Sequence, residues 1–327
     1  MTITRLLWLL LALALPGALL PACGSDGDAA DGGATPAPTS AAGLIERDPA
    51  NAEVSLTIGS KNFTEQAVLG EIFAQGLEAA GYRVRTDLSL GDERAALRAL
   101  KRGDVDAYPE YTGTALLSFF GKQPDELPKD PEQAYAEAKR GFAAENLVAF
   151  PPTPFTSSNE VAVTRETAER LSLQKISDLE REAGELTLAG SPECRQRLDC
   201  LLGLERVYGL DFQRFTPVPI AERHEVLTSG DADVSIVFTT DPQIQRESEV
   251  LLLDDRSMFP PYNSSLVMRE ETARRAGPDL PRTLAMIQAR LTDENMQELN
   301  ARVDLDGQQP ADVAGAYLTE NGLIPGG

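Results

Sequence analysis

The hydrophobic and polar positions change period several times in the first part of the chain. Two short runs, "VSLTIGS" and "YRVRTDL", are β-branched or alternate between apolar and polar residues, which indicates strands. The segment between them has apolar residues at helical spacing and stops at a glycine, and Asn62 followed by Glu65 predicts a cap at its start. The result is a βαβαβ order. Its strands are expected at 54–60, 82–88 and 105–108, and its helices at 62–81 and 92–103.

A second alternation follows the proline-rich "FPPTPF" at 150–155. Its predicted strands are "EVAVT", "ELTLAG", "RFTPVP" and "ADVSIVF", and its predicted helices are "CRQRLDCLLGLERVYGL" and "AERHEVLTSG". Beyond Leu253 the pattern changes to helices rich in Ala, Leu, Gln and Arg. This alternation implies largely parallel sheets covered by helices, with a ligand site outside the carboxyl ends of the strands. We expect an α/β protein with two lobes, one formed by 53–152 plus 256–327 and the other by 153–255.

An internal similarity links the two alternations. "RGDVDAYPEYTGT", starting at Arg102, and "SGDADVSIVFTTD", starting at Ser229, both place Gly-Asp-x-Asp after a predicted helix and before a predicted strand. Gly-Asp is also common helix-stop and turn chemistry. Together with the matching βα context, the similarity indicates a pair of related lobes.

The N-terminus has the pattern of a secretion signal. Residues 1–22 contain one cation, Arg5, then an apolar run of signal-peptide length and small residues before Cys23. The tetrapeptide "LPAC" resembles a bacterial lipobox, in which the cysteine carries the lipid; an ordinary cleaved signal with an incidental cysteine is the alternative. The segment 23–52, rich in Gly, Ala, Asp, Pro and Ser, is expected to be a flexible tether, with ordered structure from about Glu53.

Charge and cysteine usage narrow the class of protein. A formal net charge of −21 over 327 residues predicts a solvated surface and argues against nucleic-acid binding. Behind a secretion signal, Cys194 and Cys200 are expected to form a disulfide. The only histidine, His224, has no second imidazole for a zinc site and is interpreted as a solvated helix residue.

Common catalytic signatures are absent from the sequence. It contains no G-x-S-x-G elbow, no H-E-x-x-H, no G-x-G-x-x-G and no phosphate-binding loop. We therefore expect no enzymatic activity. A secreted hydrolase acting on a choline ester or a similar substrate is the catalytic alternative.

Aromatic residues stand where a ligand site is expected. A quaternary ammonium group has no N–H donor and is held by the faces of aromatic rings, each contributing roughly 0.5 to 2 kcal/mol. A carboxylate at the other end of such a ligand needs Arg, Lys, hydroxyl or amide donors. Tyr111, Phe238 and Tyr262 lie in loops at predicted strand ends. The pattern therefore favours a binding site for a cation or zwitterion.

Several segments, in one order along the chain, resemble a known family. They are "IGSKNFTEQAVLGEIFAQGLEAAGY", "GDVDAYPEYTGTAL", "EVAVTRETAERLSLQKISDL", "AGSPECRQRLDCLLGLERVYGL", "VSIVFTTDPQI" and "LLLDDRSMFPPYNSSLVMR". From about residue 54 to the C-terminus, the chain is similar to the substrate-binding proteins of ABC importers for glycine betaine, choline and related quaternary ammonium osmoprotectants.

The resemblance implies a type II periplasmic-binding-protein fold, with two lobes that close over a ligand in the cleft between them. It also implies a cation cage of four aromatic side chains, mostly tyrosines. The positions that match the cage are occupied by Tyr111, Tyr262, Phe238 and Asn159. The positions that match the family's carboxylate site are occupied by Lys61, Thr114 and Arg197.

The resulting hypothesis is a monomeric, extracytoplasmic binding protein, anchored through Cys23 to the outer face of a bacterial cell membrane. It would capture glycine betaine, choline, carnitine or a similar solute and deliver it to the permease and ATPase subunits of an ABC importer, without a cofactor or metal. Tyr108 alternates with Asp106 along its strand and is expected to pack or to lie on the surface of a lobe rather than bind the ligand. Two alternatives stay open: a solute without a quaternary ammonium, which Asn159 permits, and a sensory lipoprotein without a transport role.

Overall fold

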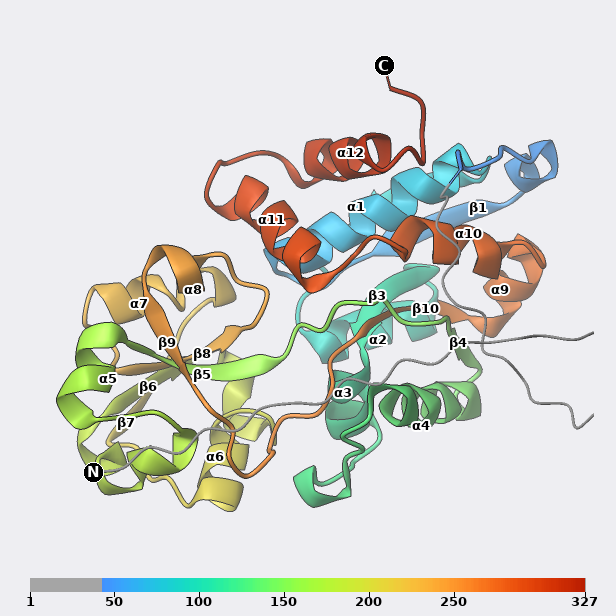
Figure 1. The fold of residues 1–327 in the computed structure, drawn as a ribbon. Coiled ribbons are helices and arrows are strands. Elements are labelled where there is room, and N and C mark those ends of the chain that lie inside the picture. Colours follow the sequence, from blue (N-terminus) through green and yellow to red (C-terminus); the bar gives the residue numbers. More distant parts are fainter. Residues whose placement is uncertain (1–42, 327) are drawn as a thin grey trace, which may run out of the picture. The chain divides into compact units, whose positions relative to one another are not determined.

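The computed structural model describes residues 43–326 (Figure 1). The predicted signal peptide, Cys23 and most of the predicted tether lie outside these residues. Within residues 43–326, no helix combines the length and the apolar character that a membrane span requires.

One five-stranded sheet is built by the first part of the chain and one late strand. Its strands are β1 (Ser55–Gly59), β2 (Arg83–Asp87), β3 (Ala107–Tyr111), β4 (Leu147–Ala149) and β10 (Ser264–Arg269), in the order β2-β1-β3-β10-β4. β1 pairs in parallel with β2 and β3, whereas β10 is antiparallel to β3 and β4. The sheet is therefore mixed but largely parallel, as expected: β2, β1, β3 and β4 run in one direction and β10 runs against them. β10 is reversed because it enters the sheet directly from the second half of the chain rather than through a crossover helix.

The second sheet repeats this order and these strand directions. Its strands are β5 (Asn159–Thr164), β6 (Thr187–Gly190), β7 (Arg214–Pro217), β8 (Val234–Phe238) and β9 (Glu249–Leu252), in the order β7-β6-β8-β5-β9. β6 is parallel to β7 and β8, and β5 is antiparallel to β8 and β9. This sheet is therefore mixed too.

The two Gly-Asp-x-Asp segments have the same role in the two sheets. Asp106 Oδ2 accepts a hydrogen bond of 2.8 Å from the backbone N–H of Thr57, and Asp233 Oδ2 accepts one of 2.9 Å from the backbone N–H of Thr187. In each sheet, a carboxylate just before the central strand, β3 or β8, thus fixes that strand to its parallel neighbour, β1 or β6. The two halves are related, as the internal similarity predicts.

Helices surround the two sheets. They are α1 (Thr64–Ala79), α2 (Glu93–Arg102), α3 (Thr112–Thr114), α4 (Pro131–Ala144), α5 (Arg165–Leu171), α6 (Leu201–Tyr208), α7 (Glu225–Thr228), α8 (Gln243–Arg246), α9 (Glu270–Ala276), α10 (Leu280–Gln288), α11 (Asp293–Asp304) and α12 (Pro310–Glu320). α1 buries Leu69, Phe73 and Leu77, and α10, α11 and α12 pack against it (Figure 1). The C-terminal part of the chain therefore returns to the first sheet.

The predicted cap at Asn62 was wrong. α1 begins at Thr64, and its N-cap is Phe63, whose extended backbone carries no side-chain cap. Glu65 does not reach back to the helix start, because its carboxylate is buried and accepts hydrogen bonds from Tyr111 and Asn300. A local capping signal was overridden by tertiary contacts.

Two predicted helices of the second half are much shorter than expected. "CRQRLDCLLGLERVYGL" forms a short 3-10 helix at Pro192–Gln196, a loop and then α6. "AERHEVLTSG" forms only a 3-10 helix at Ile220–Glu222 and α7. The interpretation of His224 as a solvated helix residue was also wrong: it precedes α7, is 6% exposed and lies between two carboxylates.

The folded part of the chain begins before Glu53, earlier than expected. Ile45 is 9% exposed, and its backbone N–H donates a 2.8 Å hydrogen bond to the carbonyl of Leu323. Asp48 caps the 3-10 helix Pro49–Glu53 through its side chain. The segment 43–52 therefore packs on the fold instead of acting as a tether.

Two crossing segments connect the sheets, one before β5 and one before β10. They run side by side, since Thr156 forms an antiparallel bridge with Asn263 and Ser157 N–H donates to the carbonyl of Tyr262 at 3.1 Å. All described residues belong to one compact unit. The crossing segments place residues from both sheets around the site described next, while the predicted lobe boundaries stay a prediction.

Candidate ligand-binding site

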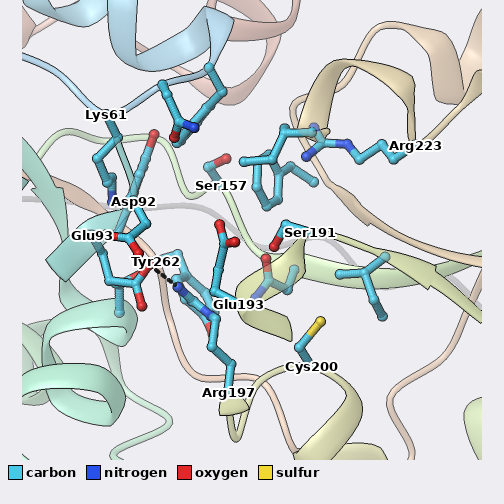
Figure 2. A pocket seen from close by; sticks show the side chains of 18 residues that line it. Lys61, Asp92, Glu93, Ser157, Ser191, Glu193, Arg197, Cys200, Arg223 and Tyr262 are labelled. Atoms are coloured by element: carbon cyan, nitrogen blue, oxygen red, sulfur yellow. Dashed lines mark ion pairs between the residues drawn. The ribbon is translucent and has the colours of Figure 1, made fainter. Parts of the chain in front are cut away.

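All seven residues selected from the sequence line one cavity (Figure 2). Tyr111 ends β3, Asn159 starts β5 and Phe238 ends β8. Lys61 follows β1, and Thr114 lies in α3 directly after β3. Arg197 and Tyr262 come from the loop after β6 and from the crossing segment before β10. Strand ends and the loops after them thus converge, which is where open α/β sheets bind ligands.

Tyr111 is held in the cavity by its hydroxyl group. This group donates a 2.6 Å hydrogen bond to Glu65 Oε1. Burial raises the pKa of Tyr111 well above its ordinary value, and the adjacent Glu65 raises it further. The phenol therefore stays protonated and donates, and its ring is fixed at the cavity.

Phe63 is an aromatic lining residue that the sequence reasoning missed. Its ring centroid lies 6.4 Å from that of Tyr111, with nearly parallel planes, and 5.4 Å from that of Phe238. It therefore bridges rings contributed by different sheets. The only sequence signal is its position two residues after Lys61, between a strand end and the first turn of α1.

The Tyr262 ring is held in place by a hydrogen bond to Asp199, in the disulfide loop of the second half of the protein. It is 2% exposed, and its hydroxyl donates a 2.5 Å hydrogen bond to Asp199 Oδ2. Gly113 lies so close that a Cβ at this glycine would be 2.8 Å from Tyr262 Cε1. The absence of a side chain at Gly113 thus leaves room for the Tyr262 ring.

Arg197 is held by carboxylates from both halves. Its Nε and Nη2 donate to Asp199 at 2.8 and 2.5 Å, and its Nη1 lies 3.1 Å from Glu93 Oε2. Burial would raise the pKa of Asp199, but the charge and hydrogen bonds of Arg197 lower it below its ordinary value. Asp199 is thus a carboxylate that fixes Arg197 and Tyr262 together.

The predicted disulfide is confirmed: Cys194 and Cys200 are bonded, with Cα atoms 5.1 Å apart. Both cysteines are buried, and the loop that they close carries Arg197 and Asp199. The bridge therefore limits the motion of the loop that presents the Arg197 guanidinium.

Replacing both Cys194 and Cys200 with alanine is expected to lower the free energy of unfolding by about 2 kcal/mol, the chain-entropy value for so short a loop. Urea unfolding followed by circular dichroism measures this change. Reductant should have no further effect on the double variant. An unchanged urea midpoint would show that the loop is held without the bridge.

Lys61 and Asn159 each satisfy a buried partner. Lys61 Nζ is 2.5 Å from Glu110 Oε1 and 4.4 Å from the centroid of the Tyr111 ring. Asn159 Nδ2 donates a 3.1 Å hydrogen bond to the carbonyl of Asp199. Asn159 therefore supports the Arg197 loop and offers no aromatic face.

The Arg223 guanidinium makes a cation–π contact with the ring of Phe238. The Cζ atom of Arg223 lies 3.8 Å from the ring centroid, and Arg223 Nη2 donates to both oxygens of Asp241 at 2.6 Å. Arg223 also lines the cavity, opposite Lys61 and Glu93 in Figure 2. This guanidinium is the main charged group that the sequence reasoning missed.

Negative charge exceeds positive charge around the cavity. Its lining cations are Lys61, Arg197 and Arg223, whereas its lining carboxylates are Asp92, Glu93 and Glu193. Three more carboxylates, Glu110, Asp199 and Asp241, contact the cations directly. Figure 2 shows the Glu193 side chain reaching into the cavity from the side of Arg197. This balance suits a ligand that brings positive charge.

Several other lining residues were not among the seven selected from the sequence as ligand-binding. They are Asn62, Phe63, Asp92, Glu93, Ser157, Ser191, Glu193, Cys200, Ile220, Arg223 and Ile236. Tyr108, by contrast, is fully buried and donates to Glu110 Oε2 at 3.0 Å, so its predicted packing role is confirmed. Within residues 43–326, no group of three or more His, Cys, Asp or Glu side chains could hold a metal ion.

Comparison with known proteins assigns the chain to a family. Residues 54–320 match the family described as the substrate binding domain of ABC-type glycine betaine transport systems. The chain is 35% identical over 297 residues to a glycine-betaine-binding protein of Pseudomonas aeruginosa, covering 88% of this chain and 94% of the relative. It is 29% identical over 276 residues to the carnitine transport binding protein OpuCC of Listeria monocytogenes, covering 83% and 88% of the two chains.

The fold agrees with this assignment. A crystal structure of a glycine betaine/carnitine/choline ABC transporter protein matches with a TM-score of 0.64 and 27% identity, covering 81% of this chain and 98% of that one. The predicted two-lobed α/β binding-protein fold is thus confirmed, and the structure adds that both of its sheets are mixed. The chain belongs to the family of substrate-binding domains of ABC-type glycine betaine transport systems and is an extracytoplasmic transport binding protein, not an enzyme.

Proposed function

We propose that the cavity between the two sheets binds a quaternary ammonium solute such as glycine betaine, choline or carnitine. The observation that carries this proposal is the combination of four aromatic lining residues, Phe63, Tyr111, Phe238 and Tyr262, with an excess of carboxylates once those that pair with the lining cations are included. Aromatic faces and negative charge are the two features that hold a cation lacking N–H donors.

The roles within the cavity follow from the chemistry of each residue. Tyr111, Phe238 and Tyr262 would contact the ammonium group, with Phe63 providing the aromatic surface that Asn159 lacks. Lys61, Thr114 and Arg197 would face the carboxylate or hydroxyl end of the solute. Arg197 and Lys61 already have carboxylate partners, Asp199 and Glu93 for one and Glu110 for the other, which weakens their attraction for a second anion. A solute with net positive charge should therefore bind at least as well as a zwitterion.

A calorimetric panel tests the ligand class. Purified mature protein is titrated with choline, glycine betaine, carnitine, ectoine and amino acids, and with 3,3-dimethylbutanol, a neutral compound of the same shape as choline. Choline is expected to bind at least about tenfold more tightly than the neutral compound, since a desolvated cation–π contact contributes up to about 2 kcal/mol. If no quaternary ammonium compound binds, the ligand proposal fails while the family assignment stands.

Replacing Tyr111 with alanine is expected to weaken binding of the best solute about three- to thirtyfold, because one aromatic wall is lost. Tyr111→Phe is the matched control, since it keeps the ring and removes only the hydrogen bond to Glu65. Isothermal titration calorimetry of both variants separates the two effects. An affinity within a factor of about two for the alanine variant would be less than even a weak cation–π contact and would contradict the cage.

Capture and delivery would use the two halves of the protein. Lys61, Tyr111, Thr114 and Tyr262 are predicted on one lobe and Asn159, Arg197 and Phe238 on the other, so a bound solute would favour the closed state by contacting both. The protein would act as a monomer and deliver the solute to a permease with ATPase subunits.

The proposed membrane attachment depends on Cys23. The lipobox-like "LPAC" supports a lipid on this cysteine, which lies outside the described residues. Fractionation of cells carrying Cys23→Ser tests it: the variant should leave the membrane fraction, whereas an unchanged distribution would exclude the anchor.

A further inference from the structure

The only histidine of the chain is buried beside the proposed ligand site. His224 Nδ1 lies 2.9 and 3.0 Å from the two carboxylate oxygens of Glu249, on β9. Its Nε2 lies 3.0 Å from Asp241 Oδ2, in the loop after β8. Arg223, its neighbour in sequence, binds the same Asp241. Arg223, Asp241, His224 and Glu249 are all buried and form a row in which positive and negative side chains alternate.

The geometry of this group of four charged residues requires a protonated imidazole on His224. An ionised carboxylate only accepts hydrogen bonds, and a neutral imidazole carries a single N–H. Both ring nitrogens of His224 face carboxylates, so both contacts are hydrogen bonds only in the imidazolium form. The charges also balance only in that form, with Arg223 and His224 opposite Asp241 and Glu249. Loss of the proton would leave one buried carboxylate facing a ring lone pair.

Asp241 connects His224 to the cavity wall. Its Oδ2 accepts a 2.7 Å hydrogen bond from the backbone N–H of Phe238, and both of its oxygens accept from Arg223 Nη2. Arg223 in turn lies on the Phe238 ring. Arg223 and Phe238 line the cavity, but His224 and Glu249 are not among its lining residues within the described chain. His224 lines a neighbouring cavity instead, where the other titratable groups are Glu65, Asp241 and Asp304. Its hydrogen-bonded connection to the ligand cavity runs through Asp241.

We propose that His224, as an imidazolium, is a positioning residue that holds Arg223 and Phe238 in the ligand site through Asp241, and that ligand affinity therefore depends on its protonation. The effect on affinity rests on the proposed function; the effect on Phe238 and Arg223 does not. The site would thus respond to alkaline pH through a group outside the lining of the ligand cavity.

The direction of the pH dependence follows from the environment of His224. Burial lowers its pKa, but hydrogen bonds to Asp241 and Glu249 raise it above the ordinary value of 6.5, against an opposing contribution from Arg223. A histidine with a raised pKa in the folded state stabilises that state fully below its ordinary pKa and loses this effect as the pH rises through the raised value. Positioning of Phe238 should therefore be intact in acid and neutral solution and weaken on the alkaline side.

Nuclear magnetic resonance tests the positioning without a ligand. Because the tag-free chain has one histidine, its imidazole signal is unambiguous. The imidazole should titrate with a midpoint above 6.5, and the Phe238 amide and Arg223 Nε–H signals should shift with that same midpoint. The proposal is overturned if the histidine midpoint is 6.5 or lower, or if Phe238 and Arg223 do not respond while His224 titrates.

Affinities for choline and glycine betaine, measured from pH 6 to pH 10, test the functional consequence. Wild-type affinity should fall above the His224 midpoint by at most about tenfold per pH unit, the limit for one proton. His224→Gln should bind about tenfold more weakly at neutral pH, the loss expected for a charge-assisted hydrogen bond, with little further change on the alkaline side. If neither solute binds at any pH, the proposed function fails, and the resonance titration still decides the positioning role.

Two further variants separate His224 from other titrating groups. Glu249 does not line the ligand cavity, and Glu249→Gln removes one partner of the imidazolium. The midpoint of the histidine titration and the decline in affinity should therefore both move to lower pH. Glu160→Gln is the control, because burial raises the pKa of Glu160 to about 7 and its titration could imitate the effect. The decline should persist in Glu160→Gln. A decline that persists in His224→Gln, or disappears in Glu160→Gln, would assign the pH dependence to a different group.

Discussion

Replacing Asp199 with alanine is expected to lower the free energy of unfolding by about 3 to 5 kcal/mol, the cost of leaving one partner of a buried ion pair uncompensated. Asp199 is completely buried and binds Arg197 through two hydrogen bonds and Tyr262 through a third. Its removal leaves the Arg197 guanidinium with Glu93 as its remaining carboxylate partner and the Tyr262 hydroxyl without an acceptor. Urea unfolding and ligand calorimetry should both show the loss.

The chain offers a matched control with the same Arg-x-Asp spacing. Arg102 and Asp104 also form a hydrogen-bonded pair, but this pair is largely exposed. Asp104→Ala should change the free energy of unfolding by less than about 1 kcal/mol, as is usual for surface ion pairs. Similar effects of Asp104→Ala and Asp199→Ala would contradict the assigned role of burial.

The loss caused by Asp199→Ala should also depend on pH. The pKa of Asp199 is lowered in the folded protein, so its carboxylate contributes stability above the ordinary aspartate pKa. This contribution is lost as the pH falls through the lowered value. The difference in stability between wild type and Asp199→Ala should therefore shrink in strongly acidic solution, which urea unfolding at a series of pH values measures.

Replacing Gly113 with alanine should lower both the stability of the protein and its affinity for the solute. The new Cβ would lie 2.7 Å from Pro260 Cγ, 2.8 Å from Tyr262 Cε1 and 2.9 Å from the carbonyl oxygen of Pro261. The carbonyl oxygen belongs to the backbone and cannot move aside alone, so the crossing segment must shift. We expect a loss of about 1 to 3 kcal/mol in stability from overpacking. Displacement of the Tyr262 ring should also weaken solute binding by more than about tenfold.

Gly184→Ala provides the control for this prediction. A Cβ at Gly184 would meet no atom within 4 Å. Its effect on stability should stay within about 0.5 kcal/mol, as for other surface substitutions. Thermal unfolding and calorimetry of the two variants give the comparison. Normal solute affinity in Gly113→Ala would mean that the Tyr262 ring is free to move without affecting the site.

Regular elements were predictable wherever local periodicity and packing agree. β1, β2, β3, β8 and α2 lie where the sequence patterns indicate. β1, β3 and β8 are short, almost fully buried runs, β2 is an exposed edge strand, and α2 is capped by Asp92 and ends at Gly103. The helix cap at Asn62 and the long helix expected around His224 failed for one shared reason. In both places a buried carboxylate contact, at Glu65 and at His224, replaces the local hydrogen bonds that the pattern assumes.

The candidate site likewise has some features that local sequence predicts and others that depend on tertiary contacts. Tyr111, Phe238 and the Cys194–Cys200 loop could be selected from the sequence, because strand ends, segment order and cysteine spacing are all local properties of the chain. The pairing of Arg197 with Glu93, the contact of Phe63 with Phe238 and the cluster around Asp241 could not. Each joins residues whose separation along the chain carries no information about their distance in space, and charge pairing and ring contact depend on that distance alone. The aromatic residues of the site were thus visible in the order of the amino acids, but the balance of charge around them arises only where the two sheets meet.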